Sequence, residues 1–196
     1  MMRVLKSKHY RRMPWRNGQG ETAEVAIGPV GGTIDDFNWR VSMAHINGDG
    51  PFSIFPDTDR TLAVLVGNGL HLSIDGNAQI DLTRDSEPLV FPGDVAVSAT
   101  LLDGGVTDLN VMTHRGPLKH SVRRVRVHGS VELAAAAPLA LLVCAQASVE
   151  VEVNARMAKL ATLDTLLVEE TPSRLRVVSD TLALIYLIQI QASEDR

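Results

Sequence analysis

Residues 50–72, GPFSIFPDTDRTLAVLVGNGLHL, are the part of the sequence that decides the fold. Residues 62–66 are leucine, alanine and valine and lie between two groups of turn residues, which is typical of a buried strand in an all-β core. The Gly-Asn-Gly of residues 67–69 predicts a tight hairpin after this strand, because glycine and asparagine adopt positive φ at low cost. Arg60 therefore opens a strand of a barrel or a sandwich.

Arg60 creates an electrostatic requirement at the start of that strand. Its guanidinium cannot be neutralised near neutral pH, so a buried Arg60 must either be paired with an acid inside the fold or be free to bind an anion. This requirement is the starting point of the functional hypothesis.

The composition is that of a globular protein. Of the 196 residues, 45% are apolar, which is enough for one domain or for two small fused halves. There is no uninterrupted apolar stretch of about 18 residues and no apolar run after the basic N-terminal segment, so we expect a soluble, unexported protein. The single cysteine, Cys144, lies in the apolar sequence LALLVC, and we expect a buried, unreactive thiol and a reducing cytoplasm.

The net charge of −4 hides two basic segments. The first sixteen residues carry six lysines and arginines and no acid, and residues 115–126 carry five more. These charges alternate with strand-forming valines and have no aromatic platform or recognition helix beside them. We therefore favour solvated barrel rims over nucleic-acid binding.

Short strand-like runs separated by turn residues continue along the chain, several with one apolar and one polar face. We expect a loop at residues 10–20, with Trp15 as a rim aromatic or lid. No long amphipathic helix occurs, and residues 131–137 are the best candidate for a helical turn or two.

An internal echo indicates a duplication. Residues 62–66, LAVLV, resemble residues 139–143, LALLV, at an offset of 77 positions, and both runs continue into a second alternating strand. Together with the order of the strands, the echo predicts a duplicated β-barrel. The second copy lacks the counterpart of Arg60, so we expect any binding site in the first half.

The turn glycines and the Pro-Gly corner of residues 92–93 resemble those of cupins. Three blocks, WRNGQGET (15–22), FNWRVSMAHINGDGPFSIFPDTDRTLAVLVGNGL (37–70) and LLDGGVTDLNVMTHRG (101–116), resemble the HutD/Ves family, whose members are accessory proteins linked to bacterial histidine utilisation.

This resemblance implies an all-β bicupin, which consists of two cupin-like β-barrels, the second one degenerate. We expect residues 1–116 to form an N-terminal cupin barrel with the ligand pocket. Residues 117–196 would form the degenerate C-terminal half, packed against the first.

A cupin metal site needs two histidines one residue apart, a glutamate soon after them and a histidine beyond the Pro-Gly corner. This sequence lacks that set: His71 is alone in its strand, and His45 and His114 lie in separate segments. There is also no phosphate-binding loop, no nucleophile elbow and no base near Cys144. We expect no metal, no cofactor and no catalytic residues.

The candidate ligand-binding residues are Arg60, Arg40, Ser42, Asn110, Asp108, Glu24 and Trp15. Two interpretations of the charged ones remain open. In the first, Arg40 or Arg60 is permanently paired with Asp108 or Glu24 and closes the end of the barrel. In the second, at least one guanidinium is free to bind a ligand carboxylate in a bidentate fork.

The family resemblance also implies a ligand. HutD-like proteins are understood to sense N-formylglutamate, a small dianion with one amide, which two arginines and Asn110 or Ser42 would complement. We interpret the chain as a non-catalytic, cytoplasmic cupin that binds such an anion and modulates histidine utilisation. The alternative is a metal-free isomerase or lyase acting on a small carboxylic acid, with Asp108 or Glu24 as base. We expect no membrane partner, and the edge strands favour a homodimer.

Overall fold

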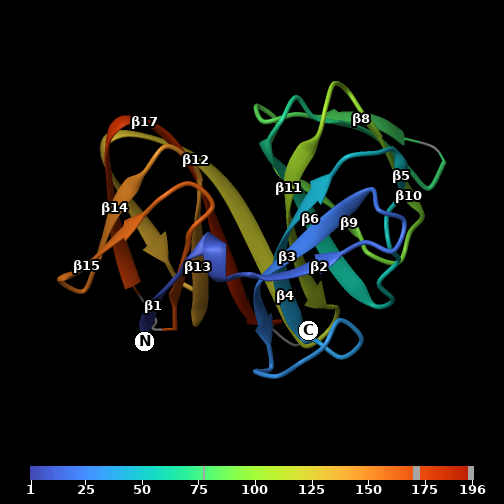
Figure 1. Cartoon of the computed structure of the whole chain (residues 1–196). Coiled ribbons are helices and arrows are strands. Elements are labelled where there is room, and N and C mark those ends of the chain that lie inside the picture. Colours follow the sequence, from blue (N-terminus) through green and yellow to red (C-terminus); the bar gives the residue numbers. More distant parts are fainter. Residues whose placement is uncertain (77, 170–172, 194–196) are drawn as a thin grey trace. The chain divides into compact units, whose positions relative to one another are not determined.

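The computed structural model describes residues 1–76, 78–169 and 173–193, which form an all-β protein (Figure 1). The described residues contain no α-helix, and their helical element is a short 3-10 helix, η1, at Ser7–His9. The predicted all-β class is confirmed. No described helix is long and apolar enough to cross a membrane.

The chain divides into two compact units. One is Arg11–Lys119, and the other combines Met1–Tyr10 with His120–Arg196. This division differs from the sequence-based boundary between residues 116 and 117, because the first ten residues belong with the C-terminal part of the chain.

The N-terminal segment joins the C-terminal unit by strand pairing. Strand β1 (Met2–Leu5), labelled in Figure 1, pairs antiparallel with β16 (Thr165–Val168). The Tyr10 hydroxyl lies 2.8 Å from the carbonyl oxygen of Leu163 and 2.9 Å from the Thr165 hydroxyl. Pairing between segments so distant in the sequence leaves no local periodicity, so the sequence pattern could not reveal it.

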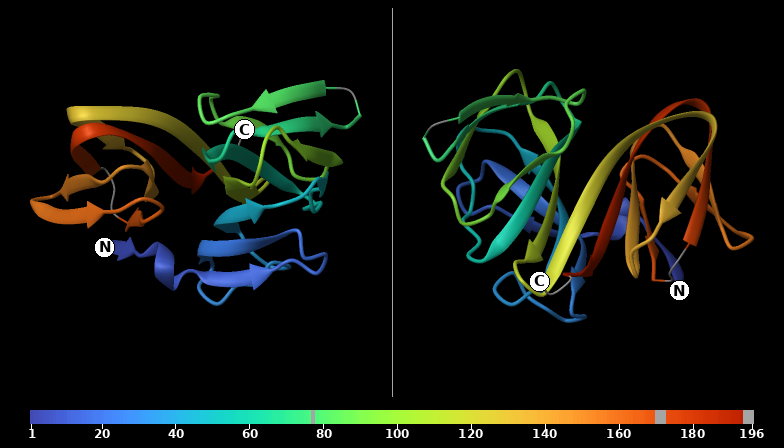
Figure 2. Two further views of the ribbon diagram at one scale, coloured as in Figure 1. Left: turned by 45° about the horizontal axis from the view of Figure 1, so that its top comes forward. Right: turned by 180° about the vertical axis from the view of Figure 1, so that it is seen from behind.

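The unit Arg11–Lys119 contains two curved sheets that form a nearly closed barrel (Figures 1 and 2). The first sheet has the order β2 (Arg11–Pro14), β3 (Gly20–Gly28), β4 (Trp39–Ile46), β11 (Val106–His114), β6 (Thr58–Val66) and β9 (Leu89–Pro92). The second has the order β5 (Gly50–Pro51), β10 (Val97–Leu101), β7 (Leu70–Ile74) and β8 (Ala78–Leu82). Apolar side chains of both sheets, such as Leu62 and Leu72, share one core.

The other unit is a single sheet. Its strands have the order β1, β16, β13 (Leu139–Gln146), β17 (Ser173–Ala192), β14 (Val149–Val153) and β15 (Arg156–Leu160), and β12 (Leu118–Ala135) also pairs with β17. Cys144 is buried in its core, and burial raises the pKa of the thiol to about 11, which makes the thiol unreactive at neutral pH.

The helical turn expected at residues 131–137 is wrong. Val131, Leu133 and Ala135 lie on strand β12 and pack against one apolar core. Their spacing of two residues is the period of a strand, and it outweighs the helix-forming alanines of this segment.

The register of the first sheet brings the predicted polar residues onto one face. The cross-strand neighbours are Asp108 with Ala44, Asn110 with Ser42, and Met112 with both Arg40 and Arg60. Because residues two apart on a strand share a face, these side chains from β4, β6 and β11 meet on the same side of the sheet.

Candidate ligand-binding pocket

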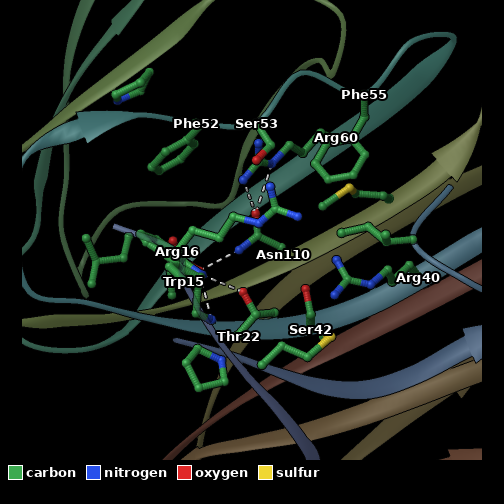
Figure 3. A pocket seen from close by; sticks show the side chains of 18 of the residues that line it. Trp15, Arg16, Thr22, Arg40, Ser42, Phe52, Ser53, Phe55, Arg60 and Asn110 are labelled. Carbon is green, nitrogen blue, oxygen red and sulfur yellow. Dashed lines mark hydrogen bonds between the residues drawn. The ribbon is translucent and has the colours of Figure 1, made fainter. Parts of the chain in front are cut away.

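The unit Arg11–Lys119 contains a pocket of about 540 Å³ (Figure 3). Six of the seven predicted site residues line it: Arg60, Arg40, Ser42, Asn110, Asp108 and Trp15. The seventh, Glu24, is not in the lining but contacts Arg40, which is. The fold therefore brings all seven predicted residues to one place.

Arg60 is almost fully buried, with 6% of its surface exposed. Its Nε donates to the Asn110 Oδ1 at 2.9 Å, and its Nη2 donates to the same oxygen. The two side chains are turned toward one another in Figure 3. The Arg60 Cζ also lies 4.7 Å from the ring centre of Phe52 and 5.4 Å from that of Phe91, so the cation is held by aromatic faces as well.

The turn before β6 fixes where Arg60 enters the sheet. Arg115 donates from its Nε to Asp59 at 3.1 Å and from its Nη1 to Asp94 at 2.9 Å, and thereby ties the start of β6 to the Pro-Gly corner. The Gly93 N–H donates to the Thr58 carbonyl at 2.6 Å. These contacts hold the turn before β6 in place and thereby fix the position of Arg60 on the strand.

Arg60 differs from the other buried arginine of the pocket in its partners. No carboxylate among the described residues forms an ion pair with it, and its hydrogen-bond acceptor is the neutral amide of Asn110. Burial lowers the pKa of Arg60 to about 10, and the nearby Asp108 opposes this shift. The guanidinium therefore stays charged at neutral pH.

Arg40 differs from Arg60 in this respect. Its Nε donates to the Glu24 Oε2 at 3.0 Å, and both side chains are largely buried. The Arg40 Nη2 is buried without a hydrogen-bond partner among the described residues. The paired, structural interpretation thus describes Arg40 and Glu24, whereas it does not describe Arg60.

Asp108 is the most deeply buried acid of the pocket, with 1% of its surface exposed. Its Oδ1 accepts hydrogen bonds from the Ala44 N–H at 3.3 Å and from the Asn110 Nδ2. Its Oδ2 is buried and has no partner among the described residues. Burial raises the pKa of Asp108 to about 7, although the positive charge of Arg60 lowers it.

Trp15 lies in the wall of the pocket, where its Nε1 donates to the Thr22 hydroxyl at 2.9 Å. The segment expected to be a loop at residues 10–20 contains strand β2, which forms a hairpin with β3. The tight connection is closed by the Trp15 N–H, which donates to the Gly20 carbonyl at 2.9 Å. The hairpin holds the aromatic ring at the pocket.

Several lining residues were not predicted from the sequence: Arg16, Ile34, Phe52, Phe55 and Met112. Arg16 belongs to the basic segment that we interpreted as a solvated rim. Phe52 and Phe55 lie in an irregular segment without alternation, so no periodicity indicated the direction of their rings. The density of aromatic residues before the Arg60 strand was the available signal.

The pocket offers donors rather than metal ligands. No group of three or more His, Cys, Asp or Glu side chains that could hold a metal ion occurs in the part of the chain that the structure describes. His71 contacts Asp81 outside the pocket, at 2.6 Å. A guanidinium, an amide and a hydroxyl beside aromatic rings can bind a small carboxylate.

Comparison with known proteins shows the family to which the chain belongs. The model of the HutD family matches residues 7–185. A relative from Pseudomonas putida, described as an uncharacterized 21.2 kDa protein in the hutC 3′ region, is 34% identical over 155 residues, which cover 79% of this chain and 80% of the relative. Protein Ves from Citrobacter koseri is 42% identical over 118 residues, which cover 58% of this chain and 60% of that protein.

Solved structures agree with the sequence comparison. HutD from Pseudomonas fluorescens SBW25 is 29% identical with a TM-score of 0.83, covering 99% of this chain and all (100%) of that one. A conserved protein of unknown function from Pseudomonas aeruginosa PAO1 is 31% identical with a TM-score of 0.91, covering 97% of this chain and 99% of that one.

More distant structures share the fold alone. Protein Ylba from E. coli is 7% identical with a TM-score of 0.75, and covers 100% of this chain and 92% of that one. A salicylate 1,2-dioxygenase from Pseudoaminobacter salicylatoxidans is 8% identical with a TM-score of 0.61, and the match covers 89% of this chain and 81% of that one. The chain therefore has a cupin-like fold and belongs to the HutD family, which is linked to the histidine-utilisation locus.

Proposed function

We propose that this protein is a non-catalytic binding protein for a small anionic intermediate of histidine degradation, with N-formylglutamate as the candidate ligand, and that ligand binding modulates histidine utilisation. The observation that carries the proposal is the unpaired charge of Arg60 inside a pocket. A buried cation is costly unless an anion compensates it. In the described structure Arg60 contacts one amide and two rings, and the nearby Asp108 stabilises its charge without an ion pair, so a ligand carboxylate would improve the site.

The comparison with other arginines of the same unit supports this reading. Arg40 is paired with Glu24, and Arg115 is paired with Asp59 and Asp94. Among the buried arginines that line the pocket, Arg60 is therefore the one whose charge is available to a ligand.

The remaining lining residues complement an N-acylated acidic amino acid. Arg16 and the buried Arg40 offer further positive charge, while Ser42 and Asn110 offer groups for an amide. The volume of about 540 Å³ is within the usual range for small-molecule sites.

We also propose that the two units are duplicated cupin-like barrels, which makes the chain a bicupin. In the first unit, β9 pairs with β6, β10 pairs with β7, and β11 pairs with β6. In the second unit, β16 pairs with β13, and β17 pairs with both β14 and β13. This correspondence matches β6 with β13, which are the strands that carry the sequence echo.

A metal-free isomerase or lyase is the second candidate function, because Asp108 has a property that a general base needs. Burial raises its pKa to about 7, close to the ideal for proton transfer at neutral pH. Its free oxygen is buried, however, and Glu24 is engaged by Arg40. Asp108 lines the pocket but is only 1% exposed, and Glu24 does not line it, so we favour binding.

An NMR titration of the labelled protein with N-formylglutamate tests the proposal. We expect saturable shifts of pocket amides while the ligand stays chemically unchanged. Conversion of the ligand would support the enzyme, and the absence of any shift at millimolar ligand would refute the proposed function. We also propose that the protein is cytoplasmic and forms a homodimer, and light scattering tests the homodimer.

A further inference from the structure

We propose that the pocket takes up its anionic ligand together with a proton, which the buried carboxyl group of Asp108 holds. This inference rests on the proposed function and adds a property that anion binding alone does not require: the affinity depends on pH through one named residue.

Three buried side chains connect the anion site to Asp108. Arg60 donates to the Asn110 Oδ1, and the Asn110 Nδ2 donates to the Asp108 Oδ1. Asn110, with 4% of its surface exposed, thus fills the space between the guanidinium and the carboxyl group. Both charges are buried, so each shifts the pKa of the other.

The free pocket leaves Asp108 close to balance between its two protonation states. One of its oxygens accepts two hydrogen bonds, and the other is buried without a partner, so the charged form is poorly solvated. Burial raises the pKa of Asp108 to about 7, and the charge of Arg60 is the strongest influence in the opposite direction. Removal of that charge would shift the balance toward the protonated form.

A ligand carboxylate bound to Arg60 would shift Asp108 toward its protonated form. When it pairs with Arg60, its negative charge offsets the positive field that favours ionised Asp108. The pKa of Asp108 is therefore higher in the complex. By linkage, a ligand that raises this pKa binds with uptake of a proton.

The other charged groups around Asp108 do not replace it in this role. Glu24 of β3 is bound to Arg40 of β4. Strand β6 supplies the charged residue Arg60, and Arg16 lies exposed on the connection between β2 and β3. The described lining of the pocket contains no histidine. Asp108 is therefore the pocket group whose pKa lies near neutrality.

Isothermal titration calorimetry with N-formyl-L-glutamate tests the inference between about pH 6 and pH 9. Measurements at each pH in two amine buffers with different heats of ionisation, at one ionic strength, separate the heat of binding from the heat of buffer ionisation without adding a competing oxyanion such as phosphate. We expect uptake of about half a proton at pH 7 and more at pH 8, with a Kd that is constant below pH 7 and rises up to about tenfold per pH unit above it. The carboxylates of the ligand stay ionised throughout.

Asp108→Asn supplies the matched variant. Its side-chain oxygen can still accept from Asn110 and Ala44, but it cannot ionise. We expect its Kd to be independent of pH between about pH 6 and pH 9 and its binding to proceed without proton uptake. Asp103→Asn, an exposed aspartate that contacts Asn68 outside the pocket, should keep the wild-type profile.

The outcomes separate this inference from the proposed function. Binding with a constant Kd and equal heats in the two buffers would overturn the proton coupling and leave the binding function intact. Absence of binding at every pH would overturn both. If Asp108→Asn does not fold, a carbon-13 titration of the wild-type Asp108 carboxyl group decides, because we expect its pKa to rise when ligand is added and an unchanged value contradicts the coupling.

Discussion

Arg60 and Arg40 flank Met112 on one face of the same sheet, yet their partners give them different roles. Arg40→Ala would leave the Glu24 carboxylate without its cation, so we expect the free energy of unfolding to fall by about 3–5 kcal/mol. Arg60→Ala would leave the neutral amide of Asn110 without its donor and the Asp108 carboxyl group, which can be protonated, without a nearby cation, so we expect a smaller change of about 1 kcal/mol. Urea denaturation of both variants measures the difference.

The same substitution of Arg60 should act on binding. Because a charge-assisted hydrogen bond contributes about 1.5–3 kcal/mol, we expect Arg60→Ala to weaken N-formylglutamate binding about ten- to a hundredfold. Arg60→Lys should restore only part of the affinity, since an ammonium group cannot reproduce the planar fork. A large loss of stability in Arg60→Ala with unchanged affinity would make Arg60 a structural residue.

Asp108 predicts a pH dependence of stability. Its folded-state pKa of about 7 lies above the ordinary value of 3.8, so the folded chain binds more protons and the wild type loses stability as the pH rises from about 4 to about 7. Asp108→Asn removes this loss, and its advantage over the wild type should grow by about 2 kcal/mol between pH 5 and pH 8. Thermal unfolding at the two pH values measures it, and an equal difference at both would contradict the assigned pKa.

A turn at residues 67–69 connects β6, the strand of Arg60, to β7 in the second sheet. The hairpin predicted after this strand is wrong, because β6 pairs with β9 and β11 whereas β7 pairs with β8 and β10. Gly69 has φ +128°, and a Cβ there would lie 2.5 Å from the Leu82 carbonyl oxygen. Gly69→Ala should therefore lower the free energy of unfolding by about 1–3 kcal/mol more than Gly104→Ala, whose φ is +67° in open space. Chemical denaturation compares the two variants, and equal costs would show that backbone contact does not constrain this turn.

At the scale of the whole molecule, the first ten residues should stabilise the unit with which they pair. β1 adds a strand beside β16, and the Lys6 ammonium binds Asp164 at 2.9 Å. Deletion of residues 1–10 should speed amide exchange in β16 and β13 while that in β6 and β11 stays unchanged. Faster exchange in β6 and β11 instead would contradict the division into units.

Much of this protein follows from local sequence. Alternation and turn residues predicted the all-β class, the strand that contains Arg60 and the polar faces that carry Asp108 and Asn110, although that strand begins at Thr58 and not at Arg60. The motif blocks predicted the family. These features are local because a side chain two positions away on a strand points to the same face whatever lies across the sheet.

Only the tertiary structure decided which charges meet. Glu24 pairs with Arg40, and Asn110 instead of an acid holds Arg60, because partners depend on the register between strands that are distant in the sequence. The same holds for β1, which pairs with β16, and for Asp108, whose pKa depends on burial by strands from both sides. Strand register and burial are collective properties of the folded chain, and no single segment encodes them.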